Sequence, residues 1–184
     1  MIEESVTTKV EFAEAVQTEV SGKTVTVKAE KGEVSKKFDI DGISLKKDNG
    51  RIEVTAKPNT RQMRAMMKTV VGHLKNMQAG VTQGYKYKLA IVFSHFPMNV
   101  SIKEDKVEIT NFAGEKSPRH SKILPGVKVE VKGKDVFVSG VDREKVGQTA
   151  ANLETATKLK GKDRRIFQDG IYIVEKNLEE VKHE

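Results

Sequence analysis

The chain contains an internal repeat, and this repeat restricts the possible folds more than any other feature of the sequence. The segment ISLKKDNGRIEV at residues 43–54 matches VKVEVKGKDVFV at residues 127–138, 84 positions later (43 to 127). In both segments apolar residues alternate with polar ones around a short turn, which in the first is Asn49-Gly50. This period-two pattern predicts a β-hairpin in each half of the chain. Two looser matches extend the repeat: Gly84-Tyr85 corresponds to Gly170-Ile171, and residues 32–35 correspond to residues 114–117.

A segment with helical periodicity follows each predicted hairpin. In the first half it runs from about Thr60 to Ala79, and in the second from about Asp142 to Thr157, with Asp142 as the N-cap. This order of elements predicts an α+β fold of two tandem, duplicated small domains, each an antiparallel sheet packed with one main helix. The alternative is a single larger mixed sheet in which the likeness of the halves is accidental.

The boundary between the two predicted domains falls within residues 80–97. We expect an N-terminal α+β repeat at residues 1–88 and a C-terminal α+β repeat at residues 89–184. The pattern leaves open whether a strand at residues 85–93 closes the first sheet or opens the second. The acidic first twenty residues are expected to form an additional helix, and LEEVKHE at residues 178–184 a frayed tail.

The composition indicates a polyanionic partner. The chain has 33 Lys and Arg against 26 Asp and Glu, a formal net charge of +7, and nucleic acid is the leading candidate for such a partner. The absence of cysteine excludes disulfides, thiolate metal sites and thiol nucleophiles. The sequence has no basic, apolar start typical of a signal peptide and no run long enough to span a membrane, so we expect a soluble, intracellular protein.

The basic residues are concentrated in particular segments. No Asp or Glu occurs between Val54 and Lys103. On a helix at residues 60–78, four basic residues fall together on one face, and the opposite, apolar face consists of Met63, Met66, Val70, Leu74 and Met77. A solvated outer face is the alternative, but such a face usually interleaves both signs of charge. We therefore expect this face to contact phosphates; its bases are Arg61, Arg64, Lys68 and Lys75.

Two loops carry the remaining concentrations of positive charge. The stretch KLKGKDRRIFQDGIYI at residues 158–173 surrounds Gly161 with bases and then continues into an apolar strand. The stretch EKSPRHSK at residues 115–122 contains Pro118, which argues against regular structure there. Two basic loops and a basic helix form a footprint too broad for a single small anion.

The sequence gives little support to an enzyme. None of the four histidines, His73, His95, His120 and His183, has the spacing of a helical metal site, and no phosphate-binding glycine motif occurs. We expect no metal or cofactor. A nucleotide- or phosphate-binding enzyme that uses the basic C-terminal loop remains the alternative function. A module that binds acidic proteins is less favoured, because aromatic anchors make up only 5% of the chain.

Three motifs resemble the universal large-subunit ribosomal protein L6 family, in its archaeal and eukaryotic form. The first is Lys162-x-x-Arg165-x-Phe167-x-Asp169-Gly170-Ile171-Tyr172-Ile173-x-x-Lys176, the second is GVTQGY at residues 80–85, and the third is the hairpin-then-helix segment at residues 127–154. The resemblance covers nearly the whole chain. One departure is Thr155, where the family pattern usually has glutamine.

The resemblance implies a tandem duplication of one α+β domain without catalytic activity. It implies a structural role on large-subunit rRNA, near the sarcin–ricin loop and the translation-factor site of the cytoplasmic ribosome, beside neighbouring ribosomal proteins. It also implies that Lys162, Arg165 and Lys176 contact rRNA, whereas Phe167 and residues 171–173 seat the final strand. With the basic surfaces included, the predicted RNA-binding residues are Lys158, Lys160, Lys162, Arg164, Arg165, Lys176, Lys116, Arg119, His120, Lys122, Arg61, Arg64, Lys68 and Lys75.

Overall fold

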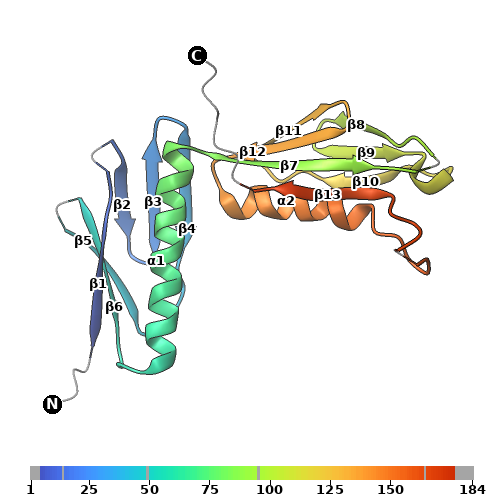
Figure 1. Ribbon diagram of the computed structural model, residues 1–184. Helices are drawn as coiled ribbons and strands as arrows, with labels where there is room; N and C mark the ends of the chain where they lie inside the picture. The colour runs from blue at the N-terminus through green and yellow to red at the C-terminus, as the bar shows by residue number, and fades with distance from the viewer. Residues whose placement is uncertain (1–4, 14, 49, 95, 164, 177–184) are drawn as a thin grey trace. The chain divides into compact units, whose positions relative to one another are not determined.

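The computed structural model describes residues 5–13, 15–48, 50–94, 96–163 and 165–176. The chain divides into two compact units, Met1–Gly84 and Tyr85–Glu184. Figure 1 shows that each unit consists of antiparallel strands and one long helix. Among the residues named above, Asn49, His95, Arg164 and His183 lie outside the described part of the chain, as does the tail expected at residues 178–184.

The first unit contains two three-stranded antiparallel sheets and one helix. The sheets have the strand orders β1-β6-β5 and β2-β3-β4, and helix α1 contacts β1 and β6 of one sheet and β3 and β4 of the other. The core between them is formed by the alternate, inward-facing apolar residues of the strands, such as Val25, Val27, Ile52 and Val54. The elements are β1 (Val6–Glu11), β2 (Gln17–Ser21), β3 (Thr24–Ala29), β4 (Gly32–Lys37), β5 (Ile43–Asp48), β6 (Arg51–Ala56) and α1 (Arg61–Thr82).

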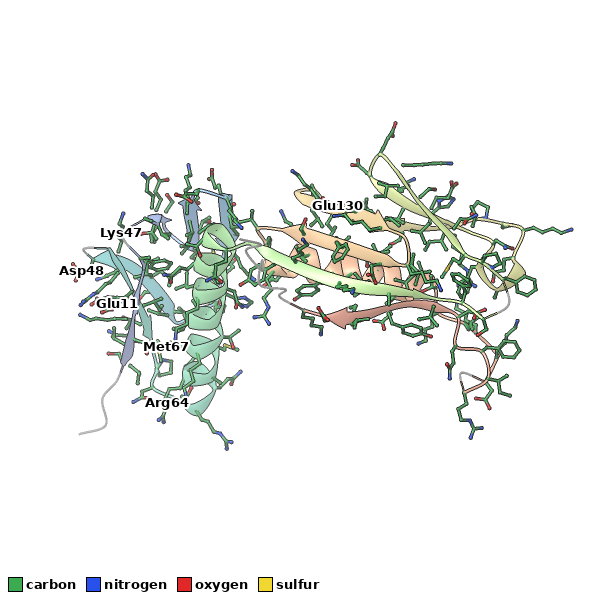
Figure 2. The ribbon with its side chains drawn as sticks, turned by 45° about the horizontal axis from the view of Figure 1, so that its top comes forward. Glu11, Lys47, Asp48, Arg64, Met67 and Glu130 are labelled. Atoms are coloured by element: carbon green, nitrogen blue, oxygen red, sulfur yellow. The ribbon has the colours of Figure 1, made fainter. Side chains whose placement is uncertain are left out.

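Helix α1 begins and ends at recognisable capping residues. The Oγ1 atom of Thr60 accepts a hydrogen bond from the Met63 N–H (3.2 Å), and the helix ends before Gly84, whose φ of +77° suits glycine. The predicted apolar face is present, with one difference. Met67 is buried, whereas Met63 and Met66, which the periodicity placed on the apolar face, are only half-buried. Figure 2 labels Met67, whose sulfur accepts a hydrogen bond from the Thr8 hydroxyl of β1.

The prediction of a helix within the first twenty residues is wrong, because this part of the chain forms β1 and most of β2. In β1, Val6, Thr8 and Val10 turn toward the core, whereas Thr7, Lys9 and Glu11 are exposed. The charged residues therefore occupy the outer face of a strand and pair across it: Lys9 contacts Glu53 at 2.7 Å, and Arg51 contacts Glu11 at 2.9 Å. The many acidic residues of this segment suggested the start of a helix, although its apolar and polar residues alternate with the period of two that is typical of a strand.

The second unit contains a four-stranded sheet of order β11-β12-β7-β13 and a three-stranded sheet of order β10-β9-β8. Helix α2 contacts the larger sheet and also β10, and its N-cap is Asp142, as predicted. Leu153 of this helix and Val136, Val138 and Ile171 of the sheet form part of the core between them. The elements are β7 (Tyr85–Val92), β8 (Asn99–Lys103), β9 (Lys106–Thr110), the short 3-10 helix η1 (Phe112–Gly114), β10 (Arg119–Lys122), β11 (Val127–Lys132), β12 (Asp135–Gly140), α2 (Arg143–Ala156) and β13 (Gly170–Glu175).

The duplication is visible in the strand pairing. Hairpins β5–β6 and β11–β12 begin on the equivalent pairs Ile43↔Ala56 and Val127↔Gly140. Strand β7 pairs with β12 as β1 pairs with β6, so the strand after α1 belongs to the second sheet. The α+β class with two duplicated units is thereby confirmed, and the alternative of a single mixed sheet does not hold.

Candidate nucleic-acid interface

The prediction that residues 115–122 lack regular structure is wrong for their second half, because Arg119–Lys122 forms β10. The segment that leads into β10 and the loop after α2 lie at one end of the second unit (Figure 1) and line a groove of about 520 Å³. One wall comes from η1 and the start of β10, and the other comes from the end of α2 and the loop after it. The structure therefore brings together predicted residues that are about forty positions apart in the sequence. The charged or ionisable residues that line the groove are Glu115, Arg119, His120, Lys158, Lys160 and Lys162.

Arg119 joins the two walls of this groove. Its Nε and Nη2 atoms donate to the two carboxylate oxygens of Glu115 (2.8 and 2.6 Å). Its Nη1 atom donates to the carbonyl oxygens of Ala156 (2.8 Å) and Lys158 (3.2 Å) at the end of α2. The guanidinium also lies 4.3 Å from the centre of the Phe112 ring. Arg119 thus uses most of its donors inside the protein, although its place in a basic stretch of the sequence predicted a contact with RNA.

Glu115 is held as an anion by this arrangement. The hydrogen bonds from Arg119 lower the pKa of the Glu115 carboxyl below its ordinary value of 4.5. The bidentate pairing matches the planar fork of a guanidinium, which lysine lacks. The Glu115–Arg119 pair therefore fixes the 115–119 loop against the end of α2.

The loop after α2 is attached to the sheet at its beginning and at its end. The buried Thr157 hydroxyl accepts a hydrogen bond from the Ile171 N–H of β13 (2.9 Å) and lies within hydrogen-bonding distance of the Leu153 and Glu154 carbonyl oxygens. At the other end, the Asp169 carboxylate accepts a hydrogen bond from the Ser94 N–H (2.8 Å). The loop is thereby fixed where it leaves the helix and where it enters the strand.

Within this loop the cations differ in how they are engaged. Arg165 donates through Nε and Nη2 to Asp163, and this hydrogen bonding lowers the pKa of the Asp163 carboxyl below 3.8. The Lys162 ammonium lies 4.7 Å from the centre of the Phe167 ring. Lys158 and Lys160 are exposed, and neither ammonium makes an ion pair or hydrogen bond with any described residue. These two lysines are the cations of the groove most available to an outside anion.

The other predicted residues of the second unit are exposed around the groove or away from it. Lys116 lies in the segment before β10, Lys122 is the last residue of β10, and Lys176 follows β13. Their ammonium groups, like the His120 ring, form no ion pair or hydrogen bond within the described ranges. Arg164 cannot be placed, because it lies outside the described residues.

The predicted basic face of α1 is a surface of the first unit. Arg61, Arg64, Lys68 and Lys75 are all exposed, and their side chains have no ion-pair partner in the part of the chain that the structure describes. Arg64 is labelled in Figure 2. The helix itself has no acidic residue, so its cations lack the i,i+4 partners that a merely solvated helix usually carries.

His73 is engaged by neighbouring side chains of the first unit. Its Nδ1 lies 3.2 Å from the Lys36 ammonium, and its ring packs 6.1 Å from Phe38. Across the described ranges, no group of three or more His, Asp or Glu is placed to hold a metal ion. No helix in the same ranges is long and apolar enough to cross a membrane.

The exposure of Phe167 was not expected from the sequence. Ile171 is fully buried in β13, but Phe167 is 39% exposed and the adjacent Ile166 is 71% exposed. Phe167 therefore does not seat the strand in the way that the resemblance implied. Only the placement of two apolar residues between bases and a turn could have indicated this from the sequence.

A tandem pair of α+β units with unpaired cations on a helix and around a groove defines a class of protein suited to a polyanion such as RNA. The family model for ribosomal protein L6 matches the chain twice, at residues 12–84 and at residues 96–170. The chain belongs to the ribosomal protein L6 family, as the motifs near its C-terminus predicted. Membership in this family makes it a structural ribosomal protein rather than an enzyme.

Relatives cover the chain almost from end to end. The large ribosomal subunit protein uL6 of Ignicoccus hospitalis is 48% identical over 169 residues, which cover 89% of this chain and 91% of the relative. The protein of the same name from Sulfurisphaera tokodaii is 44% identical over 171 residues, 92% of each chain. That of Methanothrix thermoacetophila is 43% identical over 176 residues, 96% of this chain and 99% of the relative. The similarity therefore includes both units.

Proposed function

We propose that this protein is a structural constituent of the large subunit of the cytoplasmic ribosome and binds large-subunit rRNA near the sarcin–ricin loop and the translation-factor site. Its partners are this rRNA and the neighbouring ribosomal proteins. The observation that supports rRNA binding most directly is the groove of the second unit, where two distant loops converge and the exposed Lys158 and Lys160 have no described partner. The name shared by the relatives supports the large subunit as the location.

The groove is suited to the sugar-phosphate backbone. Ammonium groups on a concave surface neutralise phosphates without reading sequence, and the narrow major groove of A-form RNA hides base edges from side chains. In this proposal Lys158, Lys160, Lys162 and His120 contact phosphates directly, whereas Arg119 holds the groove together. The exposed Arg and Lys side chains of α1 provide further RNA contacts from the first unit.

The remaining predicted residues are assigned to the surface that surrounds the groove. Arg165 reaches RNA only after leaving Asp163, because its guanidinium is occupied by that carboxylate. Lys116, before β10, and Lys122 and Lys176, at the ends of β10 and β13, are exposed and supply further phosphate contacts. Arg164 is assigned on its sequence position alone.

Removal of the free groove cations tests the proposal. The double variant Lys158→Ala/Lys160→Ala should bind large-subunit rRNA fragments more weakly. The slope of log K against log salt concentration should become less negative by about 0.7–0.9 for each lost phosphate contact. The matched control is Lys128→Ala/Lys145→Ala, which removes two exposed lysines of the same unit that do not line the groove. Equal affinities and salt slopes for wild type and the groove variant would reject the groove as the rRNA site.

The location on the subunit needs a separate experiment. Large subunits depleted of this protein should be probed chemically before and after it is added back. Protection is expected at and beside the sarcin–ricin loop, and the groove variant should restore less of it than the control variant does. Protection confined to another rRNA region would reject this location while leaving rRNA binding itself intact.

A further inference from the structure

A second, smaller cavity of about 210 Å³ adjoins the basic groove. The two share Thr155, Lys158 and Leu159 in their walls, so they are neighbouring parts of one surface. The smaller cavity differs in chemistry, since its lining includes the aromatic rings of Phe167 and Tyr172 and the carboxylates of Asp169 and Glu154. Aromatic rings and acidic acceptors are not what a phosphate requires.

The two aromatic rings are held in place around this cavity. The Tyr172 hydroxyl donates to the Gln168 carbonyl oxygen (3.1 Å), and its ring lies so close to Gly170 that a Cβ there would be 3.2 Å from it. Phe167 keeps 39% of its surface exposed, with the Lys162 ammonium 4.7 Å from its ring centre. An exposed ring among cations offers a stacking surface beside a phosphate site.

The Asp169 carboxylate is short of hydrogen-bond donors. Asp169 is only 7% exposed, and one of its oxygens accepts from the Ser94 N–H. Its other oxygen has no hydrogen bond to any described residue. Asp169 lines the cavity, so a ligand that brings an N–H group into it can donate to this second oxygen.

We propose that this cavity holds one unpaired nucleobase that carries an exocyclic amino group, as adenine, cytosine and guanine do, with the attached phosphate in the basic groove. This inference rests on the proposed rRNA binding and specifies how one nucleotide is recognised. The base stacks on Phe167 and donates from its amino group to Asp169. Bases inside an RNA duplex cannot do this, whereas bases in bulges and loops are recognised by stacking and by hydrogen bonds to their edges.

A series of RNA hairpins tests the proposal with the intact protein. The hairpins are identical except for one bulged nucleotide, which is A, C, G, U, an abasic site or absent. Bulged A, C or G should bind tighter than the abasic and fully paired hairpins by roughly 5- to 150-fold, the range expected for one stacked base. Uracil should bind more weakly than adenine and cytosine because it has no amino group and its one edge donor, N3–H, lies between two carbonyl oxygens that the Asp169 carboxylate repels. The salt slopes should be alike across the series, since the phosphate contacts do not change.

Two variants separate recognition from folding. Asp169→Asn keeps an oxygen for the Ser94 N–H and replaces the other acceptor by an amide donor, so the preference should shift from adenine and cytosine toward the carbonyl groups of uracil. Phe167→Leu keeps apolar volume without an aromatic face and should reduce the advantage of every bulged base over the abasic site. Thermal unfolding of both variants verifies that the fold is retained, and if Asp169→Asn does not fold, Phe167→Leu alone decides the question.

The outcomes distinguish this inference from the proposed function. Salt-dependent binding of equal strength to all six hairpins would overturn the base site and leave the phosphate groove standing. A base preference that Phe167→Leu leaves unchanged would also overturn it. Weak binding without salt dependence for the whole series would overturn rRNA binding by the groove, and the base site with it.

Discussion

Arg119 shows why the residue type alone does not define a binding residue. It lies in the basic stretch at residues 115–122, which predicts that it is a phosphate ligand. In the structure its guanidinium bonds to Glu115 on one side and to the carbonyl oxygens of Ala156 and Lys158 on the other. The side chain therefore joins the two walls of the groove, and under the proposed function its effect on RNA binding is indirect.

Replacement of Arg119 should loosen the groove and destabilise the second unit. Arg119→Ala removes several charge-assisted hydrogen bonds that are partly shielded from solvent, and we expect a loss of about 1–3 kcal/mol in the free energy of unfolding. Arg119→Lys retains the charge but not the fork, so it should recover only a minor part of this loss. Chemical denaturation of the three proteins measures the effect. A lysine variant as stable as wild type would show that charge alone, and not the bridging geometry, is what the site needs.

Asp163 restrains a cation that could otherwise reach RNA. Asp163→Asn keeps an oxygen for the Arg165 N–H but weakens the bond to the guanidinium, so rRNA affinity should rise and the salt slope should steepen by about 0.7–0.9 log units, one additional phosphate contact. Filter binding at several salt concentrations measures both. In the double variant Asp163→Asn/Arg165→Ala the steeper slope should disappear. If it persists, the gain comes from general charge removal and not from the release of Arg165.

At the scale of elements, the sequence was most informative where a pattern was local. The hairpins of residues 43–54 and 127–138 and the N-cap at Asp142 could be read from alternation and from short-range chemistry. Strands β1 and β2 could not, because exposed acids on one face of a strand resemble the acidic start of a helix. The convergence of residues 115–120 with the loop after α2 depends on packing between distant elements, which periodicity does not report.

Thr157 joins two such elements, because its buried hydroxyl connects the end of α2 with the start of β13. Thr157→Val preserves the shape of the side chain but leaves the buried Ile171 N–H without an acceptor, so we expect a loss of about 1–3 kcal/mol in the free energy of unfolding. The matched control is Thr155→Val, two residues earlier and exposed, which should change stability by less than about 0.5 kcal/mol. Urea unfolding compares the two. Equal effects would show that the hydroxyl of Thr157 does not connect the elements.

At the scale of the whole molecule, duplication supplied a scaffold on which two different basic surfaces were built. Both units share the pairing of a central strand, a hairpin and a covering helix. The first unit presents a row of exposed Arg and Lys side chains on α1, whereas the second presents its cations around the end of α2. The repeat therefore predicted the fold class, but the site arose from what differs between the copies, and a self-comparison of the sequence does not reveal it.

This division predicts that the second unit can act alone. Because its sheets and helix form a core of their own, residues 85–184 should unfold in one cooperative transition and should keep the affinity contributed by the groove. The fragment lacks α1, so its salt slope should be shallower than that of the full chain by about 0.7–0.9 log units for each α1 cation that contacts rRNA. The variant Arg64→Ala/Lys68→Ala in the full chain should reproduce part of this change. If the fragment and the full chain have the same slope, the bases of α1 are a solvated face, and the RNA footprint is confined to the second unit.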